Sequence, residues 1–142
     1  MGTAQVIAVD TSALVAIQLR EPDADALYQV LKQADKLLTS SASLLEARMV
    51  IHGRYGHAGV LRLDAFLSEG GFEVVPPTQD DIDTAFGAFV LYGKGNGHPA
   101  GLNFGDLFSY ALAKTRGIPL LFKGDHFSQT DIRDARNEEW KD

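Results

Sequence analysis

The stretch Val-Ile-Ala-Val-Asp at residues 6–10 is the part of the sequence that decides the fold. Four apolar, largely β-branched residues that stop at an aspartate are typical of a strand buried on both faces of a parallel sheet. The polar residues Asp10, Thr11 and Ser12 can each cap the helix that the following apolar residues predict. A buried strand that leads directly into a helix indicates the start of an α/β domain.

The rest of the chain repeats this alternation of short apolar strands and amphipathic helices. Further strands are predicted at 36–39, 72–75 and 119–122, and helices at about 13–17, 22–31, 44–54, 61–67, 78–92 and 103–116. Alternation on this scale favours a parallel sheet with helices on both faces and right-handed crossovers. We therefore predict an α/β fold, a three-layer α/β/α sandwich with a mostly parallel central sheet.

Length and composition indicate one globular domain. The chain has 142 residues, of which 45% are hydrophobic and 23% charged, and domains usually contain about 100 to 200 residues. We predict a single domain over residues 1–132. Residues 133–142 are mostly charged and are expected to form a C-terminal tail, either a surface helix or a frayed end.

The composition also excludes several classes of protein. The absence of cysteine excludes disulfides, cysteine zinc sites and thiolate nucleophiles. Neither a signal peptide nor an apolar run of about 18 residues is found, so we expect a soluble cytoplasmic protein with no membrane contact. The formal charge of −6 argues against a generally basic, nucleic-acid-binding surface.

Four acidic residues follow predicted strands or begin the helices after them. These residues are Asp10, Glu46, Asp106 and Asp125. Ligands of parallel sheets bind beyond the carboxyl ends of the strands, so we expect the four side chains to gather there. Clustered carboxylates repel one another unless a divalent cation compensates their charge. Oxygen ligands without thiols favour Mg²⁺, with Mn²⁺ as a possible substitute.

Each of these acids also has an ordinary structural explanation. Asp10 can cap the first helix, and Ser43 with Glu46 fits a capping box. Asp106 in a first helical turn suits the helix dipole, while Asp125 after a glycine is common in turns. Their shared position at the end of the sheet favours a functional site over four unrelated structural roles.

Four segments carry the acids in a fixed order. They read Val-Asp-Thr-Ser-Ala-Leu at 9–14, Leu-Leu-Glu-Ala at 44–47, Gly-Leu-Asn-Phe-Gly-Asp-Leu-Phe-Ser-Tyr-Ala-Leu-Ala-Lys at 101–114, and Leu-Leu-Phe-Lys-Gly-Asp-His-Phe at 120–127. This ordered set resembles PIN-domain ribonucleases and, more narrowly, VapC toxins of type II toxin–antitoxin systems. The resemblance extends to about Ile132. It implies a PIN-like fold and a dimeric, Mg²⁺-dependent endoribonuclease toxin that a VapB antitoxin inhibits.

The resemblance also implies roles for individual residues. Asp10 and Asp106 match the central metal-binding acids, whereas Glu46 and Asp125 match the second and fourth acids of the catalytic set. We expect Asp125 to share in metal binding. Ser12 matches a small hydroxyl residue that supports the acids and is a candidate for substrate contact.

The last motif departs from the pattern of many PIN domains. Lys123 stands two residues before the fourth acid, where a threonine is common. Asp131 is therefore an alternative to Asp125.

Binding of RNA by an acidic protein also needs local cations. Lys123 and His126, which flank the fourth acid, are the best candidates for contact with a substrate phosphate. Further candidates are Arg48, Lys94, His98, Lys114 and Arg116.

Two other functions stay open at this point. A non-catalytic PIN module would bind RNA or a protein without cleavage. A receiver-type signalling domain would accept phosphate on Asp10, but Thr11 and Ser12 follow it where a second acid is expected.

Overall fold

Four parallel strands form the centre of the computed structural model, which describes residues 4–139. The strands are β1 (Val6–Val9), β2 (Lys36–Ser40), β3 (Glu73–Val75) and β4 (Leu120–Leu121). They lie in the order β3-β2-β1-β4, and every neighbouring pair is parallel. The predicted strands are all present, and their carboxyl ends share one edge of the sheet.

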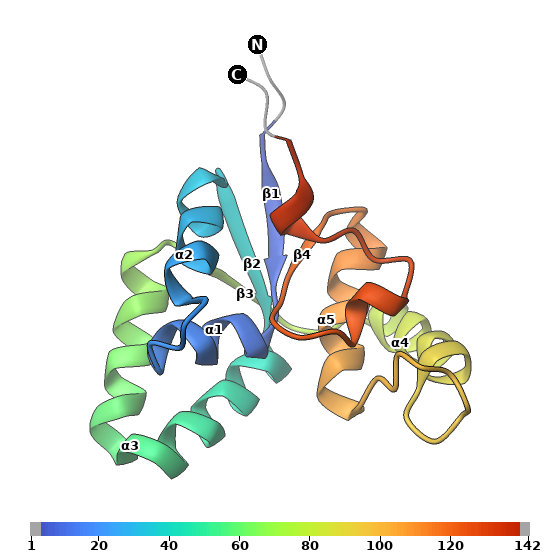
Figure 1. The fold of residues 1–142 in the computed structure, drawn as a ribbon, viewed down its shortest axis with the longest axis horizontal. Helices are drawn as coiled ribbons and strands as arrows, with labels where there is room; N and C mark the ends of the chain where they lie inside the picture. The colour runs from blue at the N-terminus through green and yellow to red at the C-terminus, as the bar shows by residue number, and fades with distance from the viewer. Residues whose placement is uncertain (1–3, 140–142) are drawn as a thin grey trace.

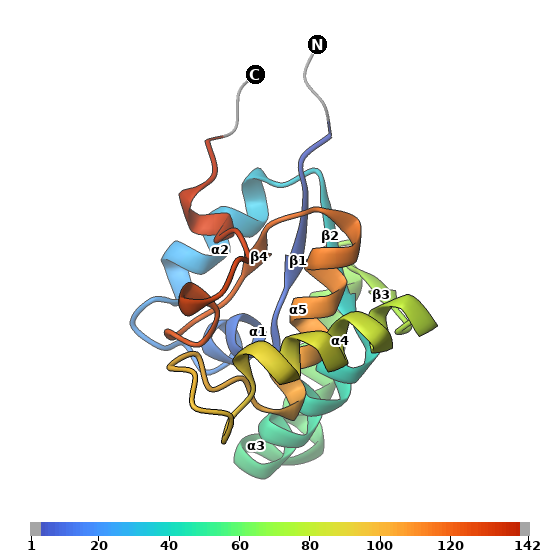
Figure 2. The same ribbon diagram turned by 90° about the vertical axis from the view of Figure 1, so that its right-hand side faces the viewer.

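Five α-helices cover the two faces of this sheet. They are α1 (Thr11–Gln18), α2 (Ala24–Gln33), α3 (Ser41–Glu69), α4 (Gln79–Tyr92) and α5 (Phe104–Arg116). Figures 1 and 2 show α1, α2 and α3 on one face and α4 and α5 on the other. The predicted three-layer α/β/α sandwich is confirmed. No helix within residues 4–139 has both the length and the hydropathy needed to cross a membrane.

The central strand β1 contributes to the core on both faces. Ile7 and Val9 pack among the helices of one layer, while Ala8 between them packs among those of the other. All three side chains are fully buried. Because successive side chains of a strand point to opposite faces, this apolar run requires a covered sheet.

The helices predicted at 44–54 and 61–67 are both present, and each is longer than predicted because they meet at Gly56. They are the two arms of α3, which begins at Ser41 after its cap Ser40 and ends at Glu69, and the backbone between the arms is non-helical at Gly56 (φ 66°, ψ −160°). The glycine absorbs the bend within one residue, so helical structure resumes immediately after it. Figure 1 shows that the first arm of α3 (41–55) and its second arm (57–69) enclose α1.

The first described residues of the C-terminal tail pack against the domain. The Leu120 amide donates to the carbonyl of Arg133 at 2.9 Å. Ala135 is buried in a short 3-10 helix, η2 (Ala135–Asn137), and the Arg136 guanidinium lies 4.7 Å from the centroid of the Phe122 ring. This part of the tail is therefore neither a longer surface helix nor a frayed end; Trp140 lies outside the described residues.

Candidate active site

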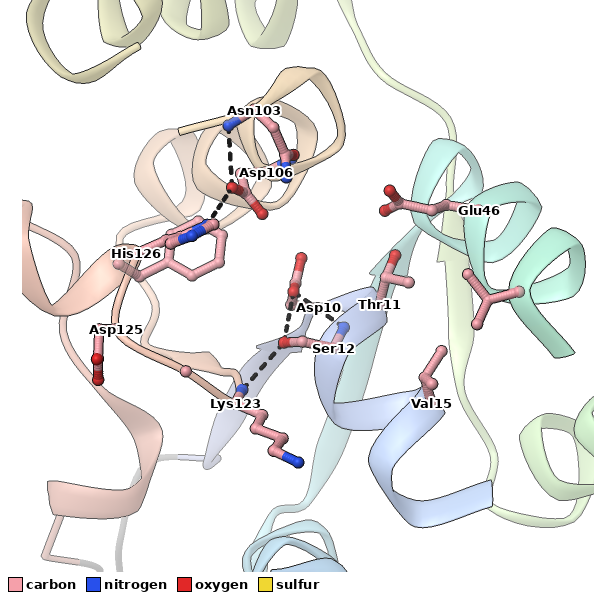
Figure 3. A pocket seen from close by; sticks show the side chains of 13 residues that line it. Asp10, Thr11, Ser12, Val15, Glu46, Asn103, Asp106, Lys123, Asp125 and His126 are labelled. Carbon is pink, nitrogen blue, oxygen red and sulfur yellow. Dashed lines mark hydrogen bonds and ion pairs between the residues drawn. The ribbon is translucent and has the colours of Figure 1, made fainter. Parts of the chain in front are cut away.

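A cavity of about 320 Å³ lies at the carboxyl edge of the sheet. Its walls come from the start of α1, the first arm of α3, the start of α5 and the segment after β4 (Figure 3). The lining includes every predicted site residue: Asp10, Ser12, Glu46, Asp106, Lys123, Asp125 and His126. The topology thus brings residues more than 100 positions apart in the sequence to one place.

Asp10 lies at the base of the cavity and is only 3% exposed. Its Oδ2 accepts hydrogen bonds from the amide and hydroxyl of Ser12, at 3.0 and 2.6 Å, and its Oδ1 accepts one from Ser109 at 2.5 Å. Burial raises the pKa of Asp10, these hydrogen bonds oppose the rise, and the charge of Asp106 adds to it. A bound cation would relieve this cost of charging a buried carboxylate.

Hydroxyl groups hold Asp10 in position. The Ser12 hydroxyl also accepts the Lys123 amide at 2.9 Å, which joins α1 to the segment after β4. Ser109 lies 3.1 Å from the hydroxyl of buried Ser43 on α3. Ser109 was not predicted from the sequence, although its spacing of three residues from Asp106 places both side chains on one face of α5.

Asp106 combines a structural and a possible catalytic role. Its Oδ2 accepts the Asn103 amide at 3.0 Å, as part of a capping box that begins α5, and lies 2.9 Å from Nδ1 of His126. Within residues 4–139, its Oδ1 has no hydrogen-bond partner. The ordinary explanation of Asp106 as a helix-start residue is therefore correct and leaves one oxygen free for a ligand.

Glu46 does not form the capping box that its spacing from Ser43 suggested, because the helix begins earlier and the Ser43 hydroxyl contacts Ser109. Figure 3 shows the Glu46 carboxylate directed toward the cavity. It lies against Gly105 of α5, where an added Cβ would come within 2.6 Å of both carboxylate oxygens. Glycine at position 105 therefore leaves room for this carboxylate.

Asp125 differs from the other three acids. It lines the cavity but is exposed, and Figure 3 shows its carboxylate turned away from Asp10 and Asp106. The alternative residue, Asp131, is not part of the lining; it accepts hydrogen bonds from Tyr110 at 2.7 Å and Lys114 at 2.6 Å.

The predicted cations are mostly paired with acids of the same chain. The Lys123 ammonium lies 2.7 Å from Glu21, and this hydrogen bond raises the pKa of Lys123. The other internal pairs are Arg48 with Asp64, Lys114 with Asp131, and Arg116 with Asp81. His126 is half-exposed beside Asp106, where it can also meet a substrate.

The donor set of the cavity fits a hard divalent cation. Carboxylates reach it from the end of β1, from α3 and from α5, and each approaches from a different side in Figure 3. In the described part of the chain, no three acidic or histidine side chains already lie close enough together to hold an ion. Asp10, Asp106 and Glu46 are nevertheless oxygen donors of the kind that Mg²⁺ and Mn²⁺ prefer.

A family model described as the PIN domain matches residues 7–133. The fold is therefore that of a PIN domain. Curated relatives narrow this class. The "VapC ribonuclease Mb0640" of Mycobacterium bovis is 48% identical over 125 residues, covering 87% of this chain and 94% of the relative. The "Ribonuclease VapC" of Mycolicibacterium smegmatis is 48% identical over 124 residues, covering 87% and 95%.

The chain belongs to the VapC ribonucleases of the PIN-domain family. Its activity class is that of a ribonuclease, and the family generally depends on divalent metal. This assignment confirms the resemblance found in the sequence and excludes the receiver-type alternative.

Solved structures agree with the fold. The Mycobacterium tuberculosis toxin VapC20, described as cleaving the sarcin-ricin loop, has a TM-score of 0.74 at 20% identity and covers 89% of this chain and 95% of its own. VapBC2 from Rickettsia felis, bound to a DNA fragment from its promoter, has a TM-score of 0.72 at 16% identity and covers 92% and 96%.

Proposed function

We propose that this chain is an endoribonuclease toxin that uses Mg²⁺, or Mn²⁺ in its place, to hydrolyse RNA phosphodiester bonds at the acidic cavity. The observation that carries the proposal is the convergence of Asp10, Glu46 and Asp106 from three elements on one cavity at the carboxyl edge. The other open function, a non-catalytic module, would not need three carboxylates held at one opening.

The site residues take different parts in the proposed reaction. Asp10 and Asp106 hold the principal ion, which would neutralise a phosphate oxygen and make an attacking water more acidic. Glu46 orients that water, because its carboxylate faces the cavity beside Gly105. The exposed carboxylate of Asp125 completes the site if it turns inward when substrate and ion are present.

Three further residues support the substrate. Ser12 holds Asp10 in place through two hydrogen bonds, which favour the ionised form of this carboxylate against the effect of burial. His126 contacts a phosphate from its position beside Asp106. Lys123 contacts a phosphate only when it exchanges Glu21 for the substrate, because the two side chains are paired at 2.7 Å.

The first experiment is cleavage of a mixed pool of transfer and ribosomal RNA. Wild-type protein and Asp10→Asn are compared with Mg²⁺, with Mn²⁺ and with a chelator. We expect discrete fragments only with wild-type protein and metal. Equal cleavage by Asp10→Asn, or cleavage that survives the chelator, would contradict the proposal.

We also propose a VapB-type antitoxin as the inhibitor and a homodimer as the assembly, acting in the cytoplasm. The Rickettsia felis structure is a VapBC complex, and a structure from Klebsiella pneumoniae with a TM-score of 0.64 is described as a toxin–antitoxin complex. In this chain, the antitoxin would place a basic residue against the acidic cavity. Exposed Leu45 and Met49 on α3 would receive its apolar side chains.

The antitoxin proposal is tested with a VapB-type antitoxin that binds this chain. We expect it to block cleavage and Mg²⁺ binding together, and a Met49→Lys variant to bind it more weakly. A partner that binds but leaves metal affinity and cleavage unchanged would contradict the proposed placement.

A further inference from the structure

A second cavity, of about 480 Å³, lies at the other end of α1 from the acidic site. Its lining consists of Ile17, Gln18, Leu19, Arg20, Tyr55 and Arg62. No acidic residue lines it, and within residues 4–139 neither of its arginines takes part in an ion pair. This distinguishes Arg20 and Arg62 from Lys123 at the acidic cavity, which is paired with Glu21.

The backbone of Arg20 gives an independent reason to examine this cavity. Arg20 is the one non-glycine residue with positive φ (54°) in the described chain. It directly follows the helix cap Leu19, with its amide donating to the Ile17 carbonyl and the next amide, of Glu21, donating to Ala16. This is the Schellman arrangement, in which glycine is the usual residue at the left-handed position.

An arginine at a left-handed position is less favourable than glycine, because its Cβ crowds the backbone. Residues kept in such conformations cluster at functional sites. Here the side chain of Arg20 lines the second cavity.

The other residues of the cavity add the chemistry of nucleic-acid binding. The Arg62 guanidinium lies 5.7 Å from the centroid of the Tyr55 ring, and this ring is 47% exposed. Arginine forks bind phosphate in a bidentate manner, and exposed aromatic rings stack on unpaired bases. The cavity therefore offers groups for both parts of a nucleotide.

The two cavities are lined by different residues of the same two helices, α1 and α3. Ser12 and Val15 of α1 line the acidic cavity, whereas Ile17 to Arg20 line the second; on α3, Glu46 and Val50 line the first and Tyr55 the second. With a helical rise of about 1.5 Å per residue, the separation along α1 is on the order of 12 Å. Sites for single-stranded nucleic acid commonly span about 4 or more nucleotides, so one strand can reach both.

We propose that the cavity formed by Arg20, Tyr55 and Arg62 is a second RNA-binding site, which holds a phosphate and a base of the substrate strand away from the scissile bond. This inference rests on the proposed ribonuclease function and adds to it. A cationic site of this kind supplies affinity that the acidic cavity and the net charge of −6 cannot supply by themselves.

The decisive variant is Arg20→Gly, because it separates binding from folding. Glycine removes the charge and suits the left-handed backbone, so the Tm should be no lower than that of wild type and up to about 3 °C higher. Affinity for a labelled single-stranded RNA of about 16 nucleotides, measured by fluorescence anisotropy with a chelator, should fall about tenfold. The slope of log affinity against log salt should become shallower by about 0.7.

Matched variants separate the site from the overall charge. Arg20→Lys keeps the cation and should retain most of the affinity. Arg62→Gln should weaken binding as Arg20→Gly does, whereas Lys36→Gln, with the same change in charge at the amino end of β2, should not. In cleavage assays with Mg²⁺, Arg20→Gly should raise KM and leave kcat unchanged.

The outcomes distinguish this inference from the proposed function. Unchanged RNA affinity in Arg20→Gly, with wild-type protein that binds and cleaves RNA, would overturn the second site alone. If Arg20→Gly loses binding to a polyglutamate peptide but keeps its affinity for RNA, the cavity binds an acidic protein ligand. This result would also overturn the second site. Wild-type protein that neither binds nor cleaves any RNA would overturn both proposals.

Discussion

Gly105 has no side chain, and the carboxylate of Glu46 occupies the space next to it where a Cβ would lie. The acids of the cavity are held in this way by small and hydroxyl residues. Ser12 and Ser109 together supply three hydrogen bonds to Asp10, which fix both of its oxygens. At the scale of single residues, the positions of Asp10 and Glu46 depend on neighbours that have no catalytic chemistry of their own.

Gly105→Ala should therefore reduce RNA cleavage with little effect on folding. The new methyl group would displace the flexible end of Glu46 rather than backbone, and a shift of about 1 Å at a catalytic group can reduce the rate by up to about 100-fold. We expect kcat to fall between about 10- and 100-fold, while the Tm is unchanged or slightly higher.

Gly87→Ala is the matched control, because Gly87 is also helical and has open space around it. It should cleave RNA at the wild-type rate. Combining Gly105→Ala with Glu46→Asp should recover part of the activity relative to Gly105→Ala, since the shorter acid fits beside the methyl group. Wild-type kcat in Gly105→Ala would show that the position of Glu46 is not important.

At the scale of secondary-structure elements, polar residues decide how the helices begin, bend and join. Asp81 completes the capping box that starts α4 and also accepts hydrogen bonds from Thr115 at 2.7 Å and Arg116 at 3.1 Å on α5. Its side chain is buried, so one carboxylate connects the two helices of a layer. Gly56 has a comparable role within α3, where it allows the two arms to enclose α1.

The stability of the α4–α5 pair should depend on the ionisation of Asp81. Burial favours its neutral form, but the stronger combined effect of the Thr78 amide, Thr115 and Arg116 lowers the pKa of Asp81 below its ordinary value of 3.8. A lowered pKa in the folded state stabilises the protein above pH 3.8, and this stabilisation is lost as the pH falls through the folded-state pKa.

Asp81→Asn should therefore lower the free energy of unfolding at pH 7 by about 2 kcal/mol. The difference from wild type should shrink as the pH is lowered below 4, because wild-type Asp81 is then also losing its charge. Urea unfolding at several pH values measures both effects. Asp83→Asn, an exposed change on the same helix, is the control; an equal loss of stability there would contradict the assignment.

The kink of α3 should be intolerant of any side chain at position 56. The backbone of Gly56, with φ 66° and ψ −160°, lies in a region that is almost restricted to glycine. Gly56→Ala should cost about 2 kcal/mol in urea unfolding. Gly53→Ala, three residues earlier in ordinary helix with open space around it, should instead stabilise the protein by about 1 kcal/mol. Equal effects would contradict this explanation of the bend.

At the scale of the whole molecule, the sandwich leaves an apolar surface on the outer face of α4. Ile82, Phe86 and Val90 follow one another at four-residue spacing and are 43%, 66% and 57% exposed. The opposite face of the helix, with Ala85 and Ala88, is buried in the core beside α5. Rows of large exposed apolar side chains are typical of interfaces, so this face suits the proposed homodimer.

Phe86→Lys should convert the protein to a monomer in light-scattering measurements. A symmetric interface contains the residue twice, so the dissociation constant should rise by about 100-fold or more. Tyr28→Lys, an exposed aromatic position on α2 in the other layer, should leave the dimer intact. A dimer that persists in Phe86→Lys would place the interface elsewhere.

The sequence by itself determined the fold class, the strands and which acids line the cavity at the carboxyl edge. Strands buried on both faces must be continuously apolar, and parallel strands must end at one edge, so the run at 6–9 and the position of Asp10 were readable from local pattern alone. The starts of the helices predicted from Thr78 and Asn103 were equally local, and the structure caps both helices at these residues. The resemblance of the acid motifs to a known family was also carried by the sequence and was confirmed by the family match.

Only the tertiary structure decided which polar groups meet. The bond from Ser109 to Asp10 joins residues 99 positions apart, and the pairing of Lys123 with Glu21 joins residues 102 positions apart. The outward direction of Asp125, the direct junction of two helices at Gly56 and the cavity of Arg20 and Arg62 were not predicted either. Local pattern reports propensity and periodicity, whereas these contacts depend on how separate elements pack, which is a property of the whole chain.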